Sequence, residues 1–140
     1  MKTLSISDIQ FIAFRLAKDL LEYDEPIPPF QTRFPNVLES CVATPFQRFQ
    51  KKLLYKGLVG RATILFYLMI KNHPFQNGNK RIAITALLVF LSKNKKWLRV
   101  DGKEFYNFTV WVAQSPADEK NYVVLAIEQF LKNHLINFNV

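Results

Sequence analysis

A run of polar, small and aromatic residues, NHPFQNGNKR, separates two apolar stretches at residues 72–81. His73 can act as a general base, and Gly78 allows a tight turn before a new helix. Lys80 and Arg81 would lie in the first helical turn, where the helix dipole disfavours cations unless an anion is bound. Amides at a helix start, with a lysine and an arginine, suit a polyphosphate. These residues predict a phosphate site with a base beside it, suited to attack of a hydroxyl on a nucleotide phosphate.

The same positions also fit an ordinary corner between two helices. Asn72 can end the first helix in the left-handed conformation, Pro74 prevents its continuation and Asn79 can cap the next helix. His73 would then merely bond the last carbonyl groups of the first helix. We favour the phosphate site because a corner needs neither first-turn cations nor a histidine facing them. Positive surroundings would also favour the neutral imidazole, the form that accepts a proton.

The stretch HPFQNGNKR, residues 73–81, resembles the signature of the Fic/Doc family, HPFx[D/E]GN[G/K]R. The upstream PNVLESCVATP and the downstream RIAITALLVFLSKN look like the death-on-curing (Doc) branch, the toxins of toxin–antitoxin pairs. The resemblance therefore covers most of the chain. It implies an all-α, compact bundle of the Fic/Doc type with a short flap hairpin or loop.

The resemblance implies a role for each position of the signature. His73 would be the base that deprotonates a target hydroxyl, and Phe75 would anchor the loop in the core. Asn77 stands where the family has an acidic Mg²⁺ ligand. Because an amide oxygen binds Mg²⁺ more weakly than a carboxylate, this departure implies a slower enzyme, another metal or lost catalysis. The positions that would bind phosphate oxygens or neutralise their charge are Gly78, Asn79, Lys80 and Arg81.

Two positions distinguish the branches of the family. Members that transfer AMP usually have Gly in place of Lys80 and a second arginine in place of Ile84. The Doc-like pattern implies an enzyme that uses ATP and Mg²⁺ to phosphorylate a Ser or Thr hydroxyl of a cytoplasmic protein, such as elongation factor Tu. Two alternatives stay open: an AMP transferase of the Fic type, and a catalytically degenerate binding module with the same fold.

An inhibitory signature of the family is matched only in part. Ser115 and Glu119 have its spacing, but Lys120 stands where Gly or Asn belongs. We therefore expect inhibition by a separate small antitoxin.

Composition sets the wider limits. The chain has 140 residues, 49% of them hydrophobic, and a net charge of +8, which fits one domain over residues 1–140. Such a charge attracts nucleotides, nucleic acid or acidic proteins, or only aids solubility. Retention of His73 argues against a nucleic-acid-binding module. The single cysteine, Cys41, excludes an intrachain disulfide framework, and no apolar run is long enough to span a membrane. We expect a cytoplasmic protein.

Periodicity and capping patterns place the elements. Ser7 with Gln10 fits a capping box, followed by an apolar stripe that includes Ile12. Asp101 fits the start of another helix, and Ser115 with Pro116 and Asp118 the start of the last. Residues 94–100 are expected to connect helices, with a short strand. The predicted helices cover residues 8–22, 36–43, 58–71, 79–93, 101–114 and 116–134.

Residues 44–56 mix aromatic and basic side chains without helical periodicity. We expect a loop or short hairpin that acts as a flap near the motif. There it would align a target peptide by strand addition, with Phe46 and Phe49 as docking residues.

Overall fold

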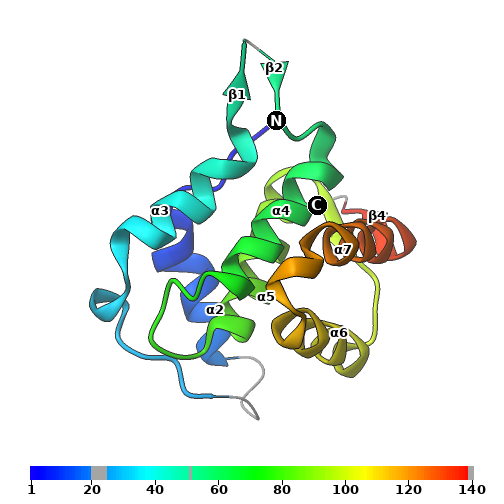
Figure 1. Ribbon diagram of the computed structural model, residues 1–140. Coiled ribbons are helices and arrows are strands. Elements are labelled where there is room, and N and C mark those ends of the chain that lie inside the picture. The colour runs from blue at the N-terminus through cyan, green and yellow to red at the C-terminus, as the bar shows by residue number, and fades with distance from the viewer. Residues whose placement is uncertain (20–24, 51, 139–140) are drawn as a thin grey trace.

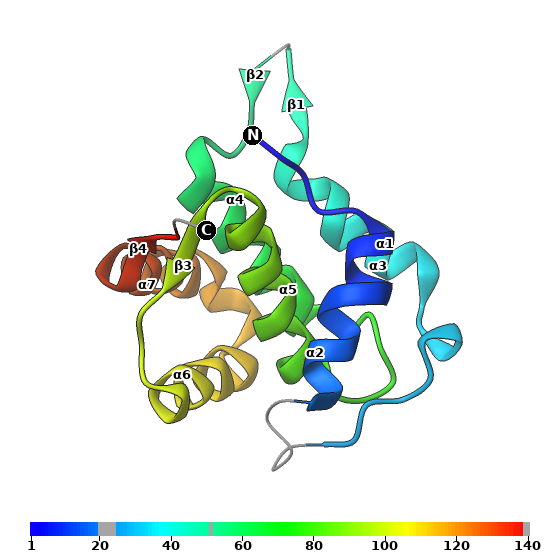
Figure 2. The same cartoon turned by 180° about the vertical axis from the view of Figure 1, so that it is seen from behind.

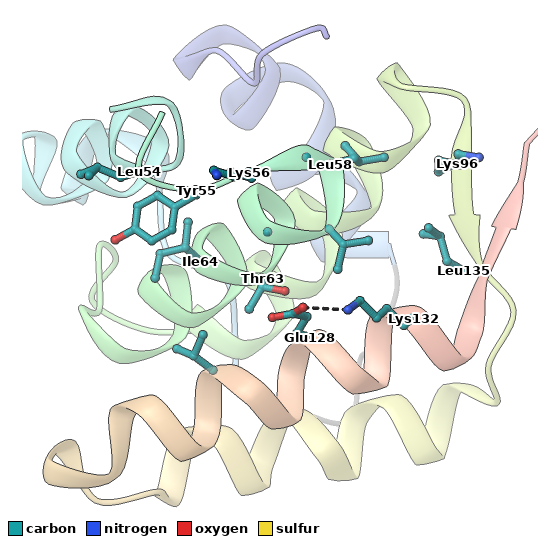
Figure 3. A pocket seen from close by; sticks show the side chains of 14 residues that line it. Leu54, Tyr55, Lys56, Leu58, Thr63, Ile64, Lys96, Glu128, Lys132 and Leu135 are labelled. Carbon is teal, nitrogen blue, oxygen red and sulfur yellow. Dashed lines mark hydrogen bonds and ion pairs between the residues drawn. The ribbon is translucent and has the colours of Figure 1, made fainter. Parts of the chain in front are cut away.

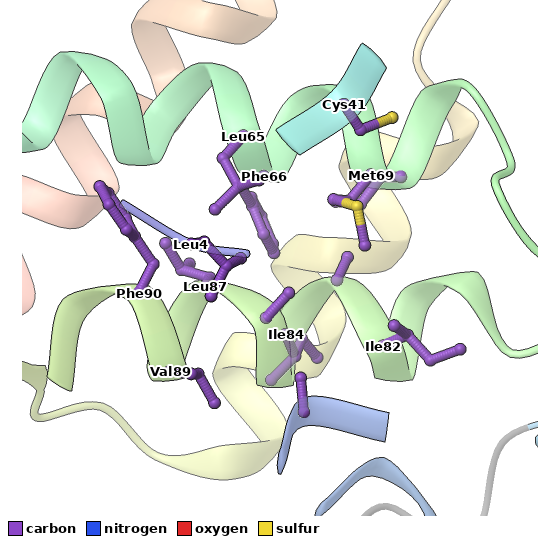
Figure 4. Close-up of a cluster of buried hydrophobic side chains, with 14 of the residues drawn as sticks. Leu4, Cys41, Leu65, Phe66, Met69, Ile82, Ile84, Leu87, Val89 and Phe90 are labelled. Carbon is purple, nitrogen blue, oxygen red and sulfur yellow. The ribbon is translucent and has the colours of Figure 1, made fainter. Parts of the chain in front are cut away.

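The computed structural model describes residues 1–19, 25–50 and 52–138. Two helices, α4 (Gly57–Lys71) and α5 (Asn79–Lys93), pack against each other at its centre (Figures 1 and 2). Figure 4 shows Phe66 and Met69 of α4 among the buried side chains between the two helices. Both helices are buried on almost every side, as their continuous apolar runs predict.

Further helices cover the central pair on two sides. The N-terminal helix and α3 lie on one side, and α6 and α7 lie on the other (Figures 1 and 2). Three further single turns are 3₁₀-helical. The bounds are α1 (Ile6–Asp8), η1 (Ile9–Ala13) and α2 (Phe14–Asp19), which together form one continuous helix, η2 (Phe30–Thr32), α3 (Pro35–Ala43), η3 (Thr44–Phe46), α6 (Gly102–Gln114), η4 (Ala117–Glu119) and α7 (Lys120–His134).

The all-α prediction is confirmed, with strands confined to two short antiparallel pairs. β1 (Arg48–Phe49) and β2 (Lys52–Leu53) form a hairpin within the segment where a loop or hairpin was expected. β3 (Lys96–Leu98) lies in the predicted connection and pairs with β4 (Leu135–Asn137), which the sequence did not reveal. Among the described residues, no helix is both long enough and apolar enough to cross a membrane.

The first helix begins earlier than predicted. The capping box is formed by Ser5 and Asp8, not by Ser7 and Gln10: the Ser5 hydroxyl accepts from the Asp8 amide at 3.0 Å, and the Asp8 carboxylate accepts from the Ser5 amide at 2.9 Å. A π-helical turn follows, because the Phe14 amide bonds the carbonyl five residues back. Ile12 is 46% exposed, so its place in the buried stripe was also wrong. The predicted last residues of this helix, 20–22, lie outside the described residues.

The capping residues predicted for α6 and α7 were right for α6 and wrong for α7. Asp101 accepts hydrogen bonds from two first-turn amides of α6, as predicted. Ser115 does not cap α7: its hydroxyl donates to Val112 O at the end of α6. The Lys71 ammonium also donates to Ala113 O and to Ser115 O. The cation Lys71 therefore stabilises the C-terminal end of α6, where the helix dipole favours positive charge.

Asp8 joins the first helix to the end of α5 and should make stability depend on pH. Burial alone would raise the pKa of its carboxyl, but hydrogen bonds from Lys93, at 2.5 Å, and from Ser5 hold that pKa below its ordinary value. The carboxylate therefore contributes stability at neutral pH, and this contribution is lost as the pH falls below about 4.

We predict that Asp8→Ala lowers the free energy of unfolding by about 1–2 kcal/mol at pH 7, because it removes a cap and an ion pair. Urea unfolding at pH 7 and at stepwise lower pH measures this, with the exposed Asp118→Ala as control. The difference between Asp8→Ala and the native protein should shrink as the pH falls. A difference that stays constant in acid would contradict the role of the charge.

Candidate active site

The loop between α4 and α5, residues 72–78 and here called the motif loop, is shaped by one left-handed residue. Asn72 keeps right-handed geometry (φ −92°, ψ −4°), so the prediction that it ends the helix in the left-handed conformation was wrong. His73 takes that conformation instead, with φ +49°. Histidine tolerates positive φ better than most residues, but the conformation still costs about 1 kcal/mol or more. Such local strain is typical of functional positions.

Phe75 holds the motif loop to the N-terminal part of the chain. Its ring is 1% exposed and lies 5.6 Å from the ring of Phe14 on α2 and 6.1 Å from that of Phe30 in η2. Phe14 and Phe30 also pack edge to face at 5.4 Å. A backbone hydrogen bond from Phe34 to Pro74 O, at 2.9 Å, adds a second attachment. The three rings therefore place His73 relative to the protein core.

Asn79 closes the loop from inside. Its side-chain oxygen accepts from the Phe75 amide at 3.0 Å, and its side-chain nitrogen donates to Phe75 O at 2.9 Å. Asn79 is the first residue of α5 and is buried, so it does not cap that helix as predicted. The N-cap is Gly78, which has no side chain to offer. The side-chain amide of Asn79 is used to shape the loop, so the start of α5 has no side-chain cap.

Gly78 meets two separate requirements for glycine. Its φ is +72°, in the left-handed region. A Cβ atom at this position would also lie 2.7 Å from Ile27 Cδ1 and 3.2 Å from Pro26 O. The proline-rich segment after residue 24 therefore lies directly against the start of α5. We had not predicted this contact from the sequence.

Arg81 is turned into the protein. It is 4% exposed, and its guanidinium donates to Ala17 O, Lys18 O and Glu25 O. Ala17 and Lys18 belong to the last described turn of α2, and their carbonyl oxygens accept from the guanidinium. The cation at the start of α5 is therefore balanced by backbone carbonyl groups of another helix. Direct contact with a phosphate would require Arg81 to leave these carbonyls.

Lys80 is the more accessible cation of the pair. Its ammonium lies 3.4 Å from the carboxylate of Glu25, with side chains that are 23% and 48% exposed. Such an exposed pair is weak, worth at most about 1 kcal/mol. An incoming phosphate can therefore exchange with Glu25. The two cations that were predicted to bind phosphate therefore differ. The guanidinium of Arg81 is held by backbone carbonyl groups, whereas the ion pair of Lys80 with Glu25 can be replaced by a phosphate.

His73 and Asn77 are the two predicted site residues of the motif loop whose side chains are accessible. His73 is exposed and Asn77 is half-buried. Both are free to meet a ligand from solvent. Within the described residues no three His, Cys, Asp or Glu side chains cluster as a metal site. Since Asn77 offers only a neutral oxygen, the loop by itself fits a divalent cation poorly.

Cys41 is not an alternative nucleophile. It lies on α3, is fully buried, and its thiol donates to Leu68 O at 3.5 Å. Burial raises the pKa of this thiol to about 11, so the reactive thiolate is essentially absent at neutral pH.

The flap interpretation requires the β1–β2 hairpin to lie beside the motif loop, but the hairpin lies elsewhere. The hairpin precedes α4 and the motif loop follows it, so they lie at opposite ends of that helix (Figures 1 and 2). The 15 residues of α4 span about 22 Å. Phe46 anchors the hairpin base: its ring lies 5.8 Å from Phe90, and Arg61 lies over it at 5.5 Å. Phe49 is 63% exposed.

The comparisons with known proteins bear on the same part of the chain. The family model described as "Fic/DOC family" matches residues 3–91, which run from before α1 to near the end of α5. The match includes the motif loop and the segment that packs on it. No curated protein and no solved structure matches the chain.

We predict that Gly78→Ala destabilises the fold by at least about 2 kcal/mol, because it adds a Cβ to a crowded site with positive φ. Gly102→Ala is the matched control. A Cβ at Gly102 would meet nothing within 4 Å, so its effect should stay within about 1 kcal/mol and can be stabilising. Urea unfolding of both variants tests this. Equal effects would mean that residues 26 and 27 do not press on the loop.

Proposed function

Since the chain belongs to the Fic/DOC family, we propose that it is a nucleotide-dependent transferase that modifies a hydroxyl group of a protein. One observation carries this proposal: within the family match, an exposed histidine with a left-handed backbone lies on the loop that leads into α5. The positive end of α5 and the exchangeable cation Lys80 follow within the next seven residues.

In its finer form, the proposed reaction is phosphoryl transfer from ATP to a Ser or Thr hydroxyl. His73 accepts the hydroxyl proton while the hydroxyl oxygen attacks the γ-phosphorus. The bond from that phosphorus to the β–γ bridging oxygen breaks, and ADP leaves with the bonding electrons. The first-turn amides of α5 and Lys80 bind the phosphate oxygens. Arg81 acts indirectly, by fixing the start of α5 against the end of α2.

Magnesium would neutralise charge on the ATP phosphates when it enters with the nucleotide. The motif loop contributes Asn77, a neutral ligand, in place of a carboxylate. The phosphates themselves must then supply most of the non-water ligands.

Ile84 supports phosphoryl transfer over AMP transfer. This position, where AMP-transferring relatives would place a second arginine, is 5% exposed and packs in the core. With Lys80 as the accessible cation, the loop resembles the Doc branch more than the AMP-transferring one. We propose that the target is a cytoplasmic protein such as elongation factor Tu, and that a separate small antitoxin restrains the enzyme. AMP transfer is the second candidate, because the base and the helix start would serve either reaction.

The test of the proposed function is His73→Asn. Asparagine tolerates positive φ, so the loop should keep its shape, but it cannot accept the proton. Loss of a general base typically lowers the rate by about 10²–10⁴. The measurement is transfer of label to protein in a bacterial lysate, and to purified elongation factor Tu, from γ-labelled and α-labelled ATP in parallel. With the native enzyme, label should pass to protein only from γ-labelled ATP, and His73→Asn should reduce this transfer.

Gln76→Ala is the control for this variant, because Gln76 is exposed on the same loop and has no assigned role. It should retain transfer. An active His73→Asn enzyme would refute the assigned mechanism. Label from the α position alone would replace phosphoryl transfer with AMP transfer.

A second prediction concerns Glu25. Removal of its charge weakens the competition with phosphate for Lys80, so Glu25→Gln should tighten ATP binding by about twofold to fivefold, with little change in stability. Calorimetric titration with ATP measures the affinity, and Glu39→Gln, an exposed position on α3, is the control. Weaker ATP binding by Glu25→Gln would show that the carboxylate assists the ligand instead of competing with it.

A further inference from the structure

A cavity lies at the other end of α4 from the motif loop. Its volume is about 540 Å³, within the range of small-molecule sites. The walls come from the start of α4, from the residues that lead into it, from α7 and from the β3–β4 pair (Figure 3). Five of the 14 lining residues lie at positions 96–135, beyond the part of the chain that the family model matches, so about a third of the cavity lining comes from the C-terminal region.

The interior of this cavity is largely apolar. Side chains of Leu58 and Ile64 on α4 face those of Val124 on α7 and Leu135 on β4. Leu54, which is 52% exposed, lies at its edge. An apolar ligand body would gain roughly 25 cal/mol for each Å² of surface that it buries here.

The polar groups of the cavity carry mostly positive charge. Lys56, Lys96 and Lys132 come from three different elements, and the acidic side chain is Glu128. Glu128 is already paired with Lys132 at 2.8 Å, and Lys96 donates to the neutral amide of Asn137. Two lysines are therefore not neutralised by the carboxylate that lines the cavity.

The start of α4 adds to this positive field. Its N-cap is Lys56, which makes no side-chain capping bond, and its first turn contains no acidic residue. A Cβ built on Gly57 would meet nothing within 4 Å, so the space in front of the first turn is open. The first amides of α4 can therefore bind an anion from that side.

Thr63 is a further sign that the cavity is built for a ligand. It is 2% exposed, and its hydroxyl has no hydrogen-bond partner within the described residues. The other buried helical threonines bond back to their own helix: Thr85 to Arg81 O at 3.2 Å, and Thr109 to Phe105 O at 2.9 Å. Figure 3 shows Thr63 turned toward the Glu128–Lys132 pair. An unsatisfied buried hydroxyl costs about 1–3 kcal/mol, so a polar partner reaching Thr63 from the cavity would stabilise the protein.

We propose that this cavity binds a small amphipathic anion. Its apolar body packs between α4 and α7, and its carboxylate, sulfate or phosphate group lies near Lys56, Lys96 and the first turn of α4. A cation is disfavoured by the same lysines, and a nucleic-acid strand would not use the apolar interior. The site does not depend on the proposed transferase reaction, because none of its lining residues belongs to the motif loop.

The test uses three octyl compounds that share one tail: octyl sulfate, octyl glucoside and octyltrimethylammonium, each below the concentration at which it forms micelles. Calorimetry should show one octyl sulfate per chain, bound at least tenfold more tightly than the neutral or cationic compound. Amide NMR shifts should change at residues 57–60 and 128–135 and stay constant at 72–81. Equal affinity for the three compounds, or shifts confined to the motif loop, would overturn the proposal.

Variants test the assigned polar groups. The double variant Lys56→Met/Lys96→Met should weaken octyl sulfate binding at least tenfold, whereas the exposed Lys103→Met on α6 should not. Thr63→Val should raise the melting temperature of the unliganded protein, because it removes an unsatisfied hydroxyl. An equal loss in Lys103→Met would mean non-specific charge attraction. Binding only to phosphatidylglycerol vesicles, and not to the free compound, would replace the cavity with a membrane surface.

Discussion

The buried guanidinium of Arg81 is the interaction on which the arrangement around the motif loop depends. It ties the start of α5 to the last carbonyls of α2 and to the backbone at Glu25. Without this side chain these carbonyl groups would lose the hydrogen bonds from a buried cation, and bonds to charged groups are worth about 1.5–3 kcal/mol each. The same tie brings Glu25 over Lys80 and Ile27 over Gly78. One side chain thus orders three separate stretches of sequence.

This interaction also answers the question of why two cations begin a helix. The sequence pattern suggested an external anion for both. The structure supplies an internal partner for Arg81, the negative end of α2, and a removable one for Lys80, the carboxylate of Glu25. A phosphate site at the start of α5 therefore relies on Lys80 and backbone amides, with Arg81 as the support that holds them in place.

Local patterns predicted the helices well because the signals that form helices are local. The continuous apolar runs indicated α4 and α5, and Asp101 indicated the start of α6. The first capping box was misplaced because Ser5 and Ser7 both precede acceptable partners, and only the geometry of Asp8 with Lys93 favours Ser5. Contacts between distant segments, such as Ile27 with Gly78 or β3 with β4, leave no periodic signal. The hairpin was expected beside the motif loop because of the family resemblance. The length of α4, which separates the two, contradicts that expectation.

The pairing of β3 with β4 has a consequence for how the chain is made. During synthesis the helices α4 and α5 leave the ribosome long before α7 and β4, which cover one side of them. Until residues 120–137 have emerged, apolar side chains such as Phe66 and Ile64 lack part of their covering. The nascent chain therefore carries an exposed apolar surface that holdase chaperones can recognise, and this surface is covered only after α7 and β4 have emerged. The ring of Trp97 lies 5.3 Å from that of Phe138, so its fluorescence can report on that closing step.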